Sequence, residues 1–284
     1  MTASMAHDDG DSTRAASWLR ETARLGYAAI GVVYVLIAAI ATRALLGWSG
    51  GENANPKHAM QWLELKSLFG TVALIAIGLG MLGYGAWRGL AAFTDPEHEG
   101  ASPIGLLKRA GFLISGLTHA GLGAQAFYYA AGSIGAAHPS PSTRGGAAGW
   151  TASVMKVPLG RWAVFAVGVG IAMYAVYEVY RSVRWKIRDV LRNDRGPTLA
   201  RDLTVWLGRT GMAIRAVVIG MIGVLLVRSA VDFDPSKAAG IGKAIAALGA
   251  WRYGWYAVAI TAIGFAIYGV YQILMARFRK IDVT

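Results

Sequence analysis

Long apolar runs separated by short polar segments make up most of this sequence. Each run exceeds twenty residues, and its charged side chains lie almost entirely at its ends. Because an α-helix rises 1.5 Å per residue, such a run can cross the roughly 30 Å of hydrocarbon in a bilayer. The pattern predicts six transmembrane helices, at Leu25–Gly47, Gly70–Phe93, Ala110–Gly132, Gly160–Val183, Thr210–Val231 and Gly254–Ala276.

These spans are expected to be helical because lipid offers no hydrogen-bonding partner to an exposed backbone. A β-barrel would instead show short segments of alternating hydrophobicity, and such segments are absent from the sequence. The polar stretch Met1–Asp11 precedes the first span and is expected to be disordered. The fold class is therefore all-α and integral to a membrane.

The spans repeat a pattern, and the repeat predicts how they are arranged. The odd spans open on Arg–x–Gly at Arg24, Arg109 and Arg209. Aligning Gly70, Gly160 and Gly254 in the even spans places a glycine ten residues on and a tyrosine fourteen residues on: Gly80, Gly170 and Gly264, then Tyr84, Tyr174 and Tyr268. Each unit holds two spans, so successive units enter the membrane in the same direction. We expect three parallel two-helix repeats about a pseudo-threefold axis, with a polar tail at 1–20 and units at 21–100, 101–200 and 201–284.

The segments between spans also have an expected structure. Three segments join the two spans of a unit, and each is amphipathic or rich in small residues, which predicts short interfacial or re-entrant helices: Asn55–Phe69, Gly145–Leu159 and Pro235–Tyr253. The connection at 181–208 is strongly basic, and Leu199, Leu203 and Trp206 follow Pro197 at helical spacing. That pattern predicts an amphipathic helix on anionic lipid headgroups. It serves either to orient the chain or to bind a lipid or a soluble partner.

Composition and charge agree with a membrane protein. Apolar residues make up 55% and charged residues 15%, against about 25% charged in soluble domains. The 37 glycines fit close helix packing in lipid, and the chain has no cysteine. A soluble enzyme, a disordered protein and a disulfide scaffold are thereby excluded. The net charge of +12 comes from Lys and Arg between the spans, so it predicts orientation and not nucleic-acid binding. These cations are more numerous on the side of the N-terminus, which places both termini in the cytoplasm.

The repeat motifs resemble a known family. The Arg–x–Gly openings, the Gly–x–x–x–Tyr pattern of the even spans and the ending Arg228–Pro235 are similar to bacterial membrane proteins of domain-of-unknown-function family 1206. The resemblance covers the chain beyond its first twenty residues. It implies three copies of a two-helix unit in a bacterial inner membrane, and it implies no catalytic residues.

A polar cluster is the main candidate site. Gly80, Tyr84 and Arg88 are spaced by four residues and share a helix face. The equivalents of Arg88 in the other two units are Glu178 and Gln272. Arg215 and Glu178 lie at matching depth from the cytoplasmic side, so we expect them to pair. The cluster is either a ligand site that favours anions or a structural ion pair, with Arg88 extending to the headgroups. Its members are Arg88, Glu178, Gln272, Arg215, Tyr84, Tyr174 and Tyr268.

Two further motifs have a structural and a functional interpretation. His119 is the one histidine within a predicted span, and it is either a proton relay, a haem ligand or a hydrogen-bonding residue between helices. The other histidines lie outside the spans, which disfavours haem. Gly78–Gly83 matches the dinucleotide pattern G-x-G-x-x-G, but no strand precedes it, so we interpret it as helix packing.

The sequence leaves two functions open. The first is a small-solute or ion pathway along the repeat axis, because three units bring polar groups to one depth. The second is a non-transporting protein that binds lipid or serves as an accessory or scaffold subunit of a membrane complex, because the centres of the spans contain few polar residues. No catalytic motif, metal site or cofactor site is predicted, and no protein partner is identified. Membrane lipids, including anionic headgroups at 181–208, are the expected partners.

Overall fold

The computed structural model describes residues 3–46, 60, 68–95, 100–133, 147–184, 187, 191 and 198–280, with only the backbone at 3–20, 22, 44, 69, 107 and 133. Within these ranges every regular element is a helix, apart from an isolated β-bridge between Leu191 and Arg279. The elements are α1 (Ala3–Leu45), α3 (Leu68–Thr94), α4 (Pro103–Ser133), α5 (Ala147–Met155), α6 (Gly160–Arg184), α7 (Thr198–Val231), the 3₁₀ turn η4 (Pro235–Lys237), α8 (Ile241–Gly249) and α9 (Gly254–Phe278). The predicted all-α class is confirmed.

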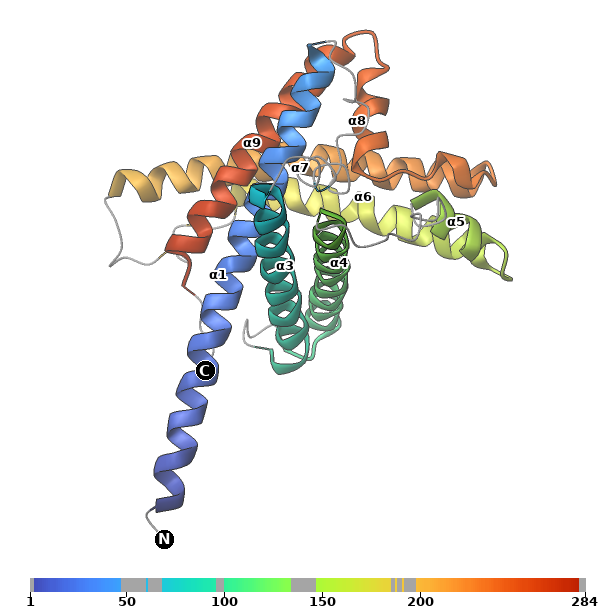
Figure 1. Ribbon diagram of the computed structural model, residues 1–284. Coiled ribbons are helices and arrows are strands. Elements are labelled where there is room, and N and C mark those ends of the chain that lie inside the picture. The colour runs from blue at the N-terminus through green and yellow to red at the C-terminus, as the bar shows by residue number, and fades with distance from the viewer. Residues whose placement is uncertain are drawn as a thin grey trace.

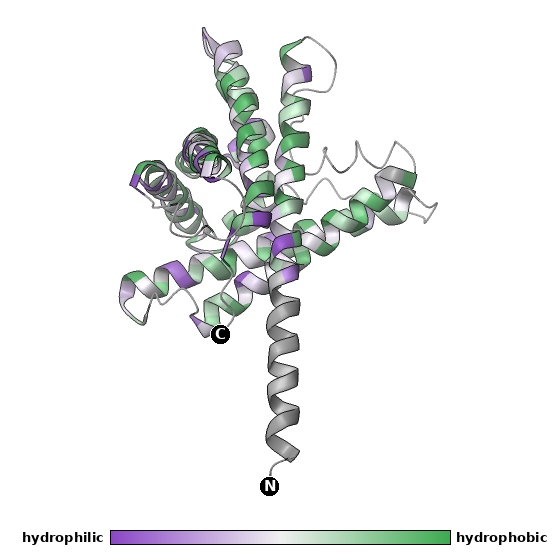
Figure 2. Cartoon of the chain, turned by 90° about the vertical axis from the view of Figure 1, so that its left-hand side faces the viewer, coloured by the Kyte–Doolittle hydropathy of each residue, from purple (hydrophilic) through white to green (hydrophobic). Residues whose placement is uncertain are grey.

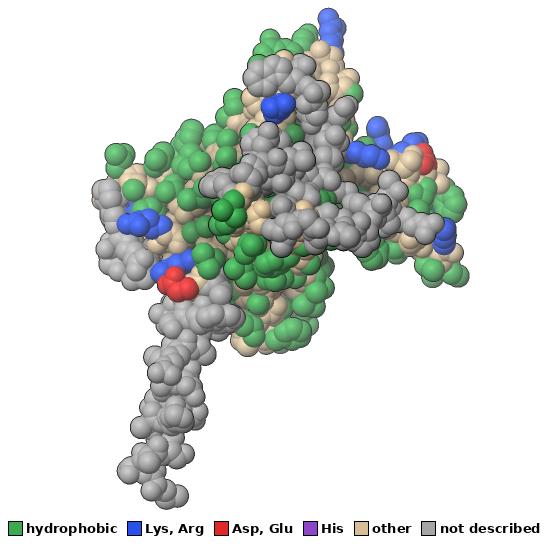
Figure 3. Space-filling view, viewed as in Figure 1, with side chains coloured by type: hydrophobic (Ala, Val, Ile, Leu, Met, Phe, Trp, Pro, Cys, Tyr) green, Lys and Arg blue, Asp and Glu red, His purple; other side chains and the backbone are tan. Residues whose placement is uncertain are grey.

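The composition and surface of the helices are those of a multi-pass membrane protein. In the described residues, five helices are long and apolar enough to cross a bilayer: α1, α3, α6, α7 and α9. The sixth long helix, α4, has 31 residues and contains Ser115, Thr118 and His119, and it is not among these five. Apolar residues run along most of the helices, with hydrophilic residues mainly at the ends and where the helices cross (Figure 2). Apolar side chains also cover much of the face in Figure 3, as expected for a surface in contact with lipid.

Two boundaries differ from the sequence prediction. The helix α1 begins at Ala3, so the disorder expected for Met1–Asp11 is wrong for the backbone that the structure describes. The amphipathic helix predicted after Pro197 is not a separate element, because α7 runs unbroken from Thr198 to Val231. The first turns of α7 bury Thr204 and expose Leu199. Residues 198–208 of the predicted headgroup-binding segment are therefore the first turns of the helix that contains the fifth predicted span.

The predicted helices between spans are present where the structure describes them. The helix α5 lies within Gly145–Leu159, and η4 and α8 lie within Pro235–Tyr253. The 3₁₀ turn η4 begins after Asp234, whose side chain accepts a 2.9 Å hydrogen bond from the backbone of Ser236. Most of Asn55–Phe69 lies outside the described residues, but Met60 is helical and fully buried.

The long helices pack as three antiparallel pairs. The helix α1 lies along α9, α3 lies along α4, and α6 lies along α7. The pairs run in different directions: α6 and α7 extend across the view of Figure 1, whereas α1 and α9 rise through it. Contacts of α1 with α3 and of α7 with α9 join the pairs. Each pair consists of an even span and the odd span of another predicted repeat, and the last helix of the chain packs on the first.

The same repeat positions form a close contact in two of the pairs. In α3 and α4, a Cβ atom at Gly85 would lie 2.8 Å from the carbonyl oxygen of Gly116. In α9 and α1 the equivalent residues are Gly269 and Gly31. A Cβ atom at Gly269 would lie 2.6 Å from the carbonyl oxygen of Gly31. In α6 and α7 the equivalents are alanines, at positions 175 and 216, and both are buried. Small residues allow these close backbone approaches, so the repeat seen in the sequence is a repeat of interhelical contacts.

One contact expected from the repeat is missing. The two spans of the first repeat pack together as α1 and α3, and those of the third as α7 and α9. Within the part of the chain that the structure describes, α4 and α6 do not pack along each other. The closed circle of six helices predicted from the sequence is therefore open between α4 and α6.

Arginine side chains cap two of the helix pairs. Arg109 of α4 donates to the carbonyl oxygens of Ala92 and Phe93 at the end of α3, at 2.8 and 2.9 Å. Arg161 of α6 donates in the same way to Ala230 and Val231 at the end of α7, also at 2.8 and 2.9 Å. The final carbonyls of a helix lack intrahelical partners and carry partial negative charge, so a guanidinium group satisfies both needs.

Replacing Arg109 with glutamine should lower the stability of the α3–α4 pair. We expect a loss of about 1 kcal/mol and a fall in Tm of about 2 °C, because two charge-assisted hydrogen bonds are removed. The measurement is thermal unfolding of the purified protein in detergent. Arg252→Gln, at an exposed position, is the matched control. An equal effect of the two substitutions would mean that the cap contributes nothing.

Candidate functional site

The three aligned tyrosines lie in two different environments. Tyr84 and Tyr268 are 6% and 7% exposed, whereas Tyr174 is 44% exposed. Arg88 donates to the hydroxyl of Tyr84 at 3.0 Å, and the Gln272 side chain donates to the hydroxyl of Tyr268 at 2.6 Å. The four-residue spacing thus places the residues on one helix face, as predicted. The hydroxyl of each buried tyrosine meets the polar side chain that lies four residues later in the same helix.

Arg215 joins four helices at the point where the pairs cross. Its Nε donates to the hydroxyl of Tyr34 on α1 at 2.8 Å, and its Nη1 donates to Glu178 on α6 at 3.1 Å. Its guanidinium carbon also lies 5.1 Å from the centre of the Tyr268 ring on α9. The predicted contact between Arg215 and Glu178 is therefore present, and it forms part of a larger network.

Glu178 is held by two arginines. Its other carboxylate oxygen accepts a 3.1 Å hydrogen bond from Arg181, one turn along α6. The Glu178 side chain is only 3% exposed, against 20% for Arg215 and 30% for Arg181. A carboxylate at this depth is stable only when it is paired. The three side chains together have a net formal charge of +1.

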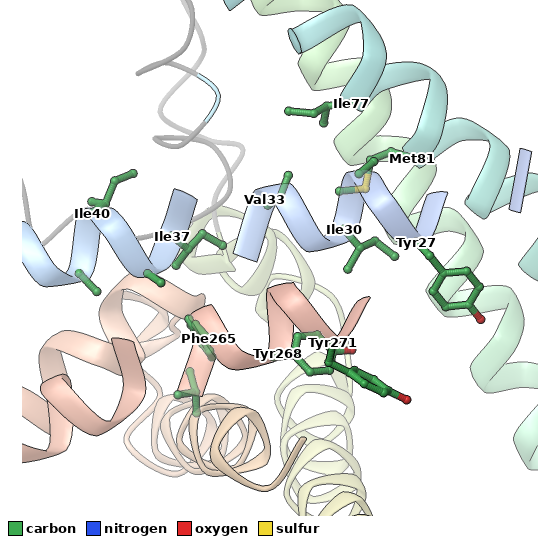
Figure 4. Packing of buried hydrophobic residues seen from close by; sticks show 14 of the residues in the cluster. Tyr27, Ile30, Val33, Ile37, Ile40, Ile77, Met81, Phe265, Tyr268 and Tyr271 are labelled. Atoms are coloured by element: carbon green, nitrogen blue, oxygen red, sulfur yellow. The ribbon is translucent and has the colours of Figure 1, made fainter. Parts of the chain in front are cut away.

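Aromatic rings fill the centre of the molecule. Tyr34 meets Tyr268 edge to face with ring centres 4.7 Å apart, and His119 meets Tyr84 at the same separation. Tyr34 and His119 are equivalent in the repeat, so two helix pairs make the same contact. Figure 4 shows Tyr268 beside the apolar side chains of α1 and α9 that form the surrounding core. Edge-to-face packing is favourable and gives a well-defined centre.

Arg88 and His119 belong to the side of the cluster formed by α3 and α4. The guanidinium carbon of Arg88 lies 4.8 Å from the centre of the Phe112 ring, a cation–π contact between the two helices. His119 Nδ1 lies 2.7 Å from the carbonyl oxygen of Ser115 in its own helix. The hydrogen bond between helices expected for His119 is therefore replaced by a bond within α4 and a ring contact with Tyr84.

Two members of the network were not predicted as site residues. The sequence prediction does not include Tyr34, and Arg181 lies at the start of the basic connection at 181–208. The position of Arg181 three residues after a buried glutamate is a spacing at which helical side chains meet, so that signal was available. Among the residues that the structure describes, no group of His, Asp and Glu is placed to hold a metal ion. The chemistry of the cluster is that of cations, hydroxyls and one carboxylate, which suits binding of an anion.

The Gly78–Gly83 motif has the packing role expected for it. A Cβ atom at Gly80 would lie 2.6 Å from the carbonyl oxygen of Leu25 on α1, and one at Gly78 would meet the ring of Phe127 on α4. Both glycines thus allow neighbouring helices to approach.

Comparisons with known proteins agree with this repeat. The family model described as Domain of Unknown Function (DUF1206) matches three segments, residues 25–95, 110–184 and 210–279. The chain belongs to this family. An uncharacterized protein, YxxB, of Bacillus subtilis (strain 168) is 29% identical over 257 residues, which is 90% of each chain. No solved structure matches the chain.

The three DUF1206 segments define unit 1 (25–95), unit 2 (110–184) and unit 3 (210–279). In unit 1, a Cβ atom at Gly26 would lie 2.4 Å from Cβ of Tyr84, and in unit 3 one at Gly211 would lie 2.9 Å from Cβ of Tyr268. The equivalent pair in unit 2 is Gly111 and Tyr174. No described atom lies within 4 Å of a Cβ position at Gly111, which explains why Tyr174 alone of the three tyrosines is half-exposed.

Proposed function

We propose that this DUF1206 protein crosses a bacterial inner membrane six times, with both termini in the cytoplasm. The length of α4 supports a sixth span, because 31 residues extend about 46 Å. The excess of Lys and Arg on the side of the N-terminus supports the orientation. A pseudo-threefold arrangement of the units is supported by the equivalent contacts Gly85–Gly116 and Gly269–Gly31. The second of these joins the last helix to the first, as rotation about an axis requires.

The function supported best is that of a non-transporting, lipid-binding membrane protein. The observation behind this proposal is the burial of Tyr84 and Tyr268, whose rings pack edge to face against His119 and Tyr34 where the helix pairs cross. A pathway for solutes along the axis would need water-lined space at this depth. Packed aromatic rings instead give a fixed centre, from which the apolar outer faces of the helices extend into lipid.

A flux measurement tests the non-transporting role. The purified protein, reconstituted in liposomes at defined density, should release no more entrapped K⁺, Cl⁻ or phosphate than protein-free liposomes do. Tyr268→Ala is the matched variant, because it removes one of the central rings. Flux through the wild-type protein that rises with protein density would contradict the proposal.

A small-solute or ion pathway is the second candidate. Its supporting observation is Tyr174, which is half-exposed and lies beside the charged Glu178–Arg215 pair. Such a pathway would pass through unit 2 and not along the axis. Flux that is abolished by Gly170→Leu, a substitution beside Tyr174 on α6, would favour this candidate over the first.

A further inference from the structure

Unit 2 exposes the surfaces that units 1 and 3 bury between their two helices. In unit 1, a Cβ atom at Gly80 would lie 2.7 Å from Cβ of Ala29, and in unit 3 one at Gly264 would lie 2.5 Å from Cβ of Ile214. The equivalent residues of unit 2 are Gly170 and Ile114. Ile114 is 66% exposed, and a Cβ atom at Gly170 would have no described atom within 4 Å.

Within the part of the chain that the structure describes, four positions of unit 2 therefore lack the contacts that their equivalents make: Gly111, Ile114, Gly170 and Tyr174. Two lie on α4 and two on α6, and all four are apolar or aromatic. We call this space the unit 2 gap. In a membrane such a gap does not stay empty, because a void loses the dispersion contacts of its walls and acyl chains are present to fill it.

Cationic groups lie beside the unit 2 gap. Tyr174 is one turn before Glu178 on α6, and Glu178 is paired with Arg215 and Arg181. Arg215 donates through Nε to Tyr34 and through Nη1 to Glu178, and its Nη2 makes no hydrogen bond to the residues that the structure describes. One fifth of the Arg215 side chain is exposed. An anion that reaches Arg215 would accept charge-assisted hydrogen bonds from this guanidinium group.

We propose that an anionic membrane lipid binds at unit 2, with an acyl chain in the unit 2 gap and its headgroup phosphate at Arg215 of the neighbouring unit 3. This inference rests on the proposed lipid-binding function and identifies the class of lipid and its site. Arg215 lies five residues beyond the predicted start of the fifth span, so its Cα is about 8 Å below the cytoplasmic interface. A lipid phosphate drawn that far below the interface would reach the exposed part of the guanidinium group, and the cytoplasmic leaflet is the one rich in anionic lipid.

Lipid titration in detergent tests this assignment. Native mass spectrometry should detect phosphatidylglycerol bound to the wild-type protein more tightly than phosphatidylcholine. Gly170→Leu fills the gap with a side chain and should weaken phosphatidylglycerol binding about tenfold, equivalent to about 1.4 kcal/mol. Gly121→Leu is the matched control on α4, because a Cβ atom there also has no described atom within 4 Å. It should leave the affinity unchanged.

Arg215→Gln should remove the preference for phosphatidylglycerol over phosphatidylcholine, and Gly170→Leu preserves a test if the Arg215 variant does not fold. Inorganic phosphate at millimolar concentration should not compete, since it has no acyl chain. Equal affinity of wild type and Gly170→Leu, or displacement of the lipid by phosphate, would overturn the proposal. Flux measurements are independent of these results, so failure of lipid binding and failure of the non-transporting role are distinguishable.

Cysteine cross-linking decides whether protein occupies the gap instead. The chain has no cysteine, so Ile114→Cys with Gly170→Cys gives one engineered pair. Under oxidation in liposomes this pair should stay reduced. A disulfide within one chain would show that α4 closes on α6. A cross-linked dimer would assign the gap to a second copy, and either result would overturn lipid binding there.

Discussion

Substituting leucine for Gly269 is expected to destabilise the protein strongly. A Cβ atom at this position would lie 2.6 Å from the carbonyl oxygen of Gly31. The obstacle is backbone and not a flexible side chain, so α1 and α9 would have to separate. Overpacking of this kind destabilises a protein by at least about 3 kcal/mol, which corresponds to a fall in Tm on the order of 10 °C. Size-exclusion chromatography in mild detergent and thermal unfolding measure the effect.

Gly89→Leu is the control for this experiment. It places the same side chain in a helix of the same protein, at a position where no described atom lies within 4 Å of a Cβ atom. We expect stability within about 0.5 kcal/mol of wild type. Because Gly85 is the repeat equivalent of Gly269, Gly85→Leu should behave like the Gly269 variant. A stable Gly269→Leu protein would show that the contact between the first and last helices is not needed for the fold.

The repeat in the sequence predicted which positions make close contacts, and it could not predict which helices make them. Gly31, Gly116 and Ala216 are equivalent, so each suits any of the three partners on an even span. The structure pairs each odd span with the even span of another unit. Local sequence contains no information on this choice, since the pairing depends on how all six helices fit together.

The unit 2 gap could not be predicted from the sequence either. Gly111 and Gly170 match the glycines that permit close packing in units 1 and 3, so the pattern predicts the same contact there. The absence of that contact is a property of the tertiary arrangement, in which α6 and α7 run across the other pairs (Figure 1). The Arg215–Glu178 pair was predictable for the opposite reason, because a deep charge requires a partner and only one carboxylate lay at matching depth.

The second large effect is expected at Glu178. Glu178→Gln leaves Arg215 and Arg181 facing each other without a carboxylate between them. Removing one partner of a buried ion pair leaves an uncompensated charge, and we expect a loss of about 3 kcal/mol. Arg215→Gln should have the smaller effect, because Glu178 then keeps its bond to Arg181. Thermal unfolding of the single variants and of the double variant in detergent gives the comparison.

The double variant isolates the pair. If Arg215 and Glu178 stabilise each other, Glu178→Gln with Arg215→Gln should be less damaging than the sum of the single changes, by about 1–3 kcal/mol. Glu21→Gln is the control, because Glu21 pairs with Arg24 at an exposed position, where an ion pair contributes at most about 1 kcal/mol. Additive effects of the two substitutions would show that the 3.1 Å contact adds no stability.

Adding phosphatidylglycerol to the same measurements separates a structural ion pair from a ligand site. If a lipid phosphate reaches Arg215, it supplies negative charge where Glu178→Gln removed it, so the lipid should restore part of the lost stability in that variant. Phosphatidylcholine has no net charge and should restore much less. In Arg215→Gln the same lipid should restore little, because the cation that would bind the phosphate is gone. A purely structural pair predicts that both variants respond to the two lipids as the wild-type protein does.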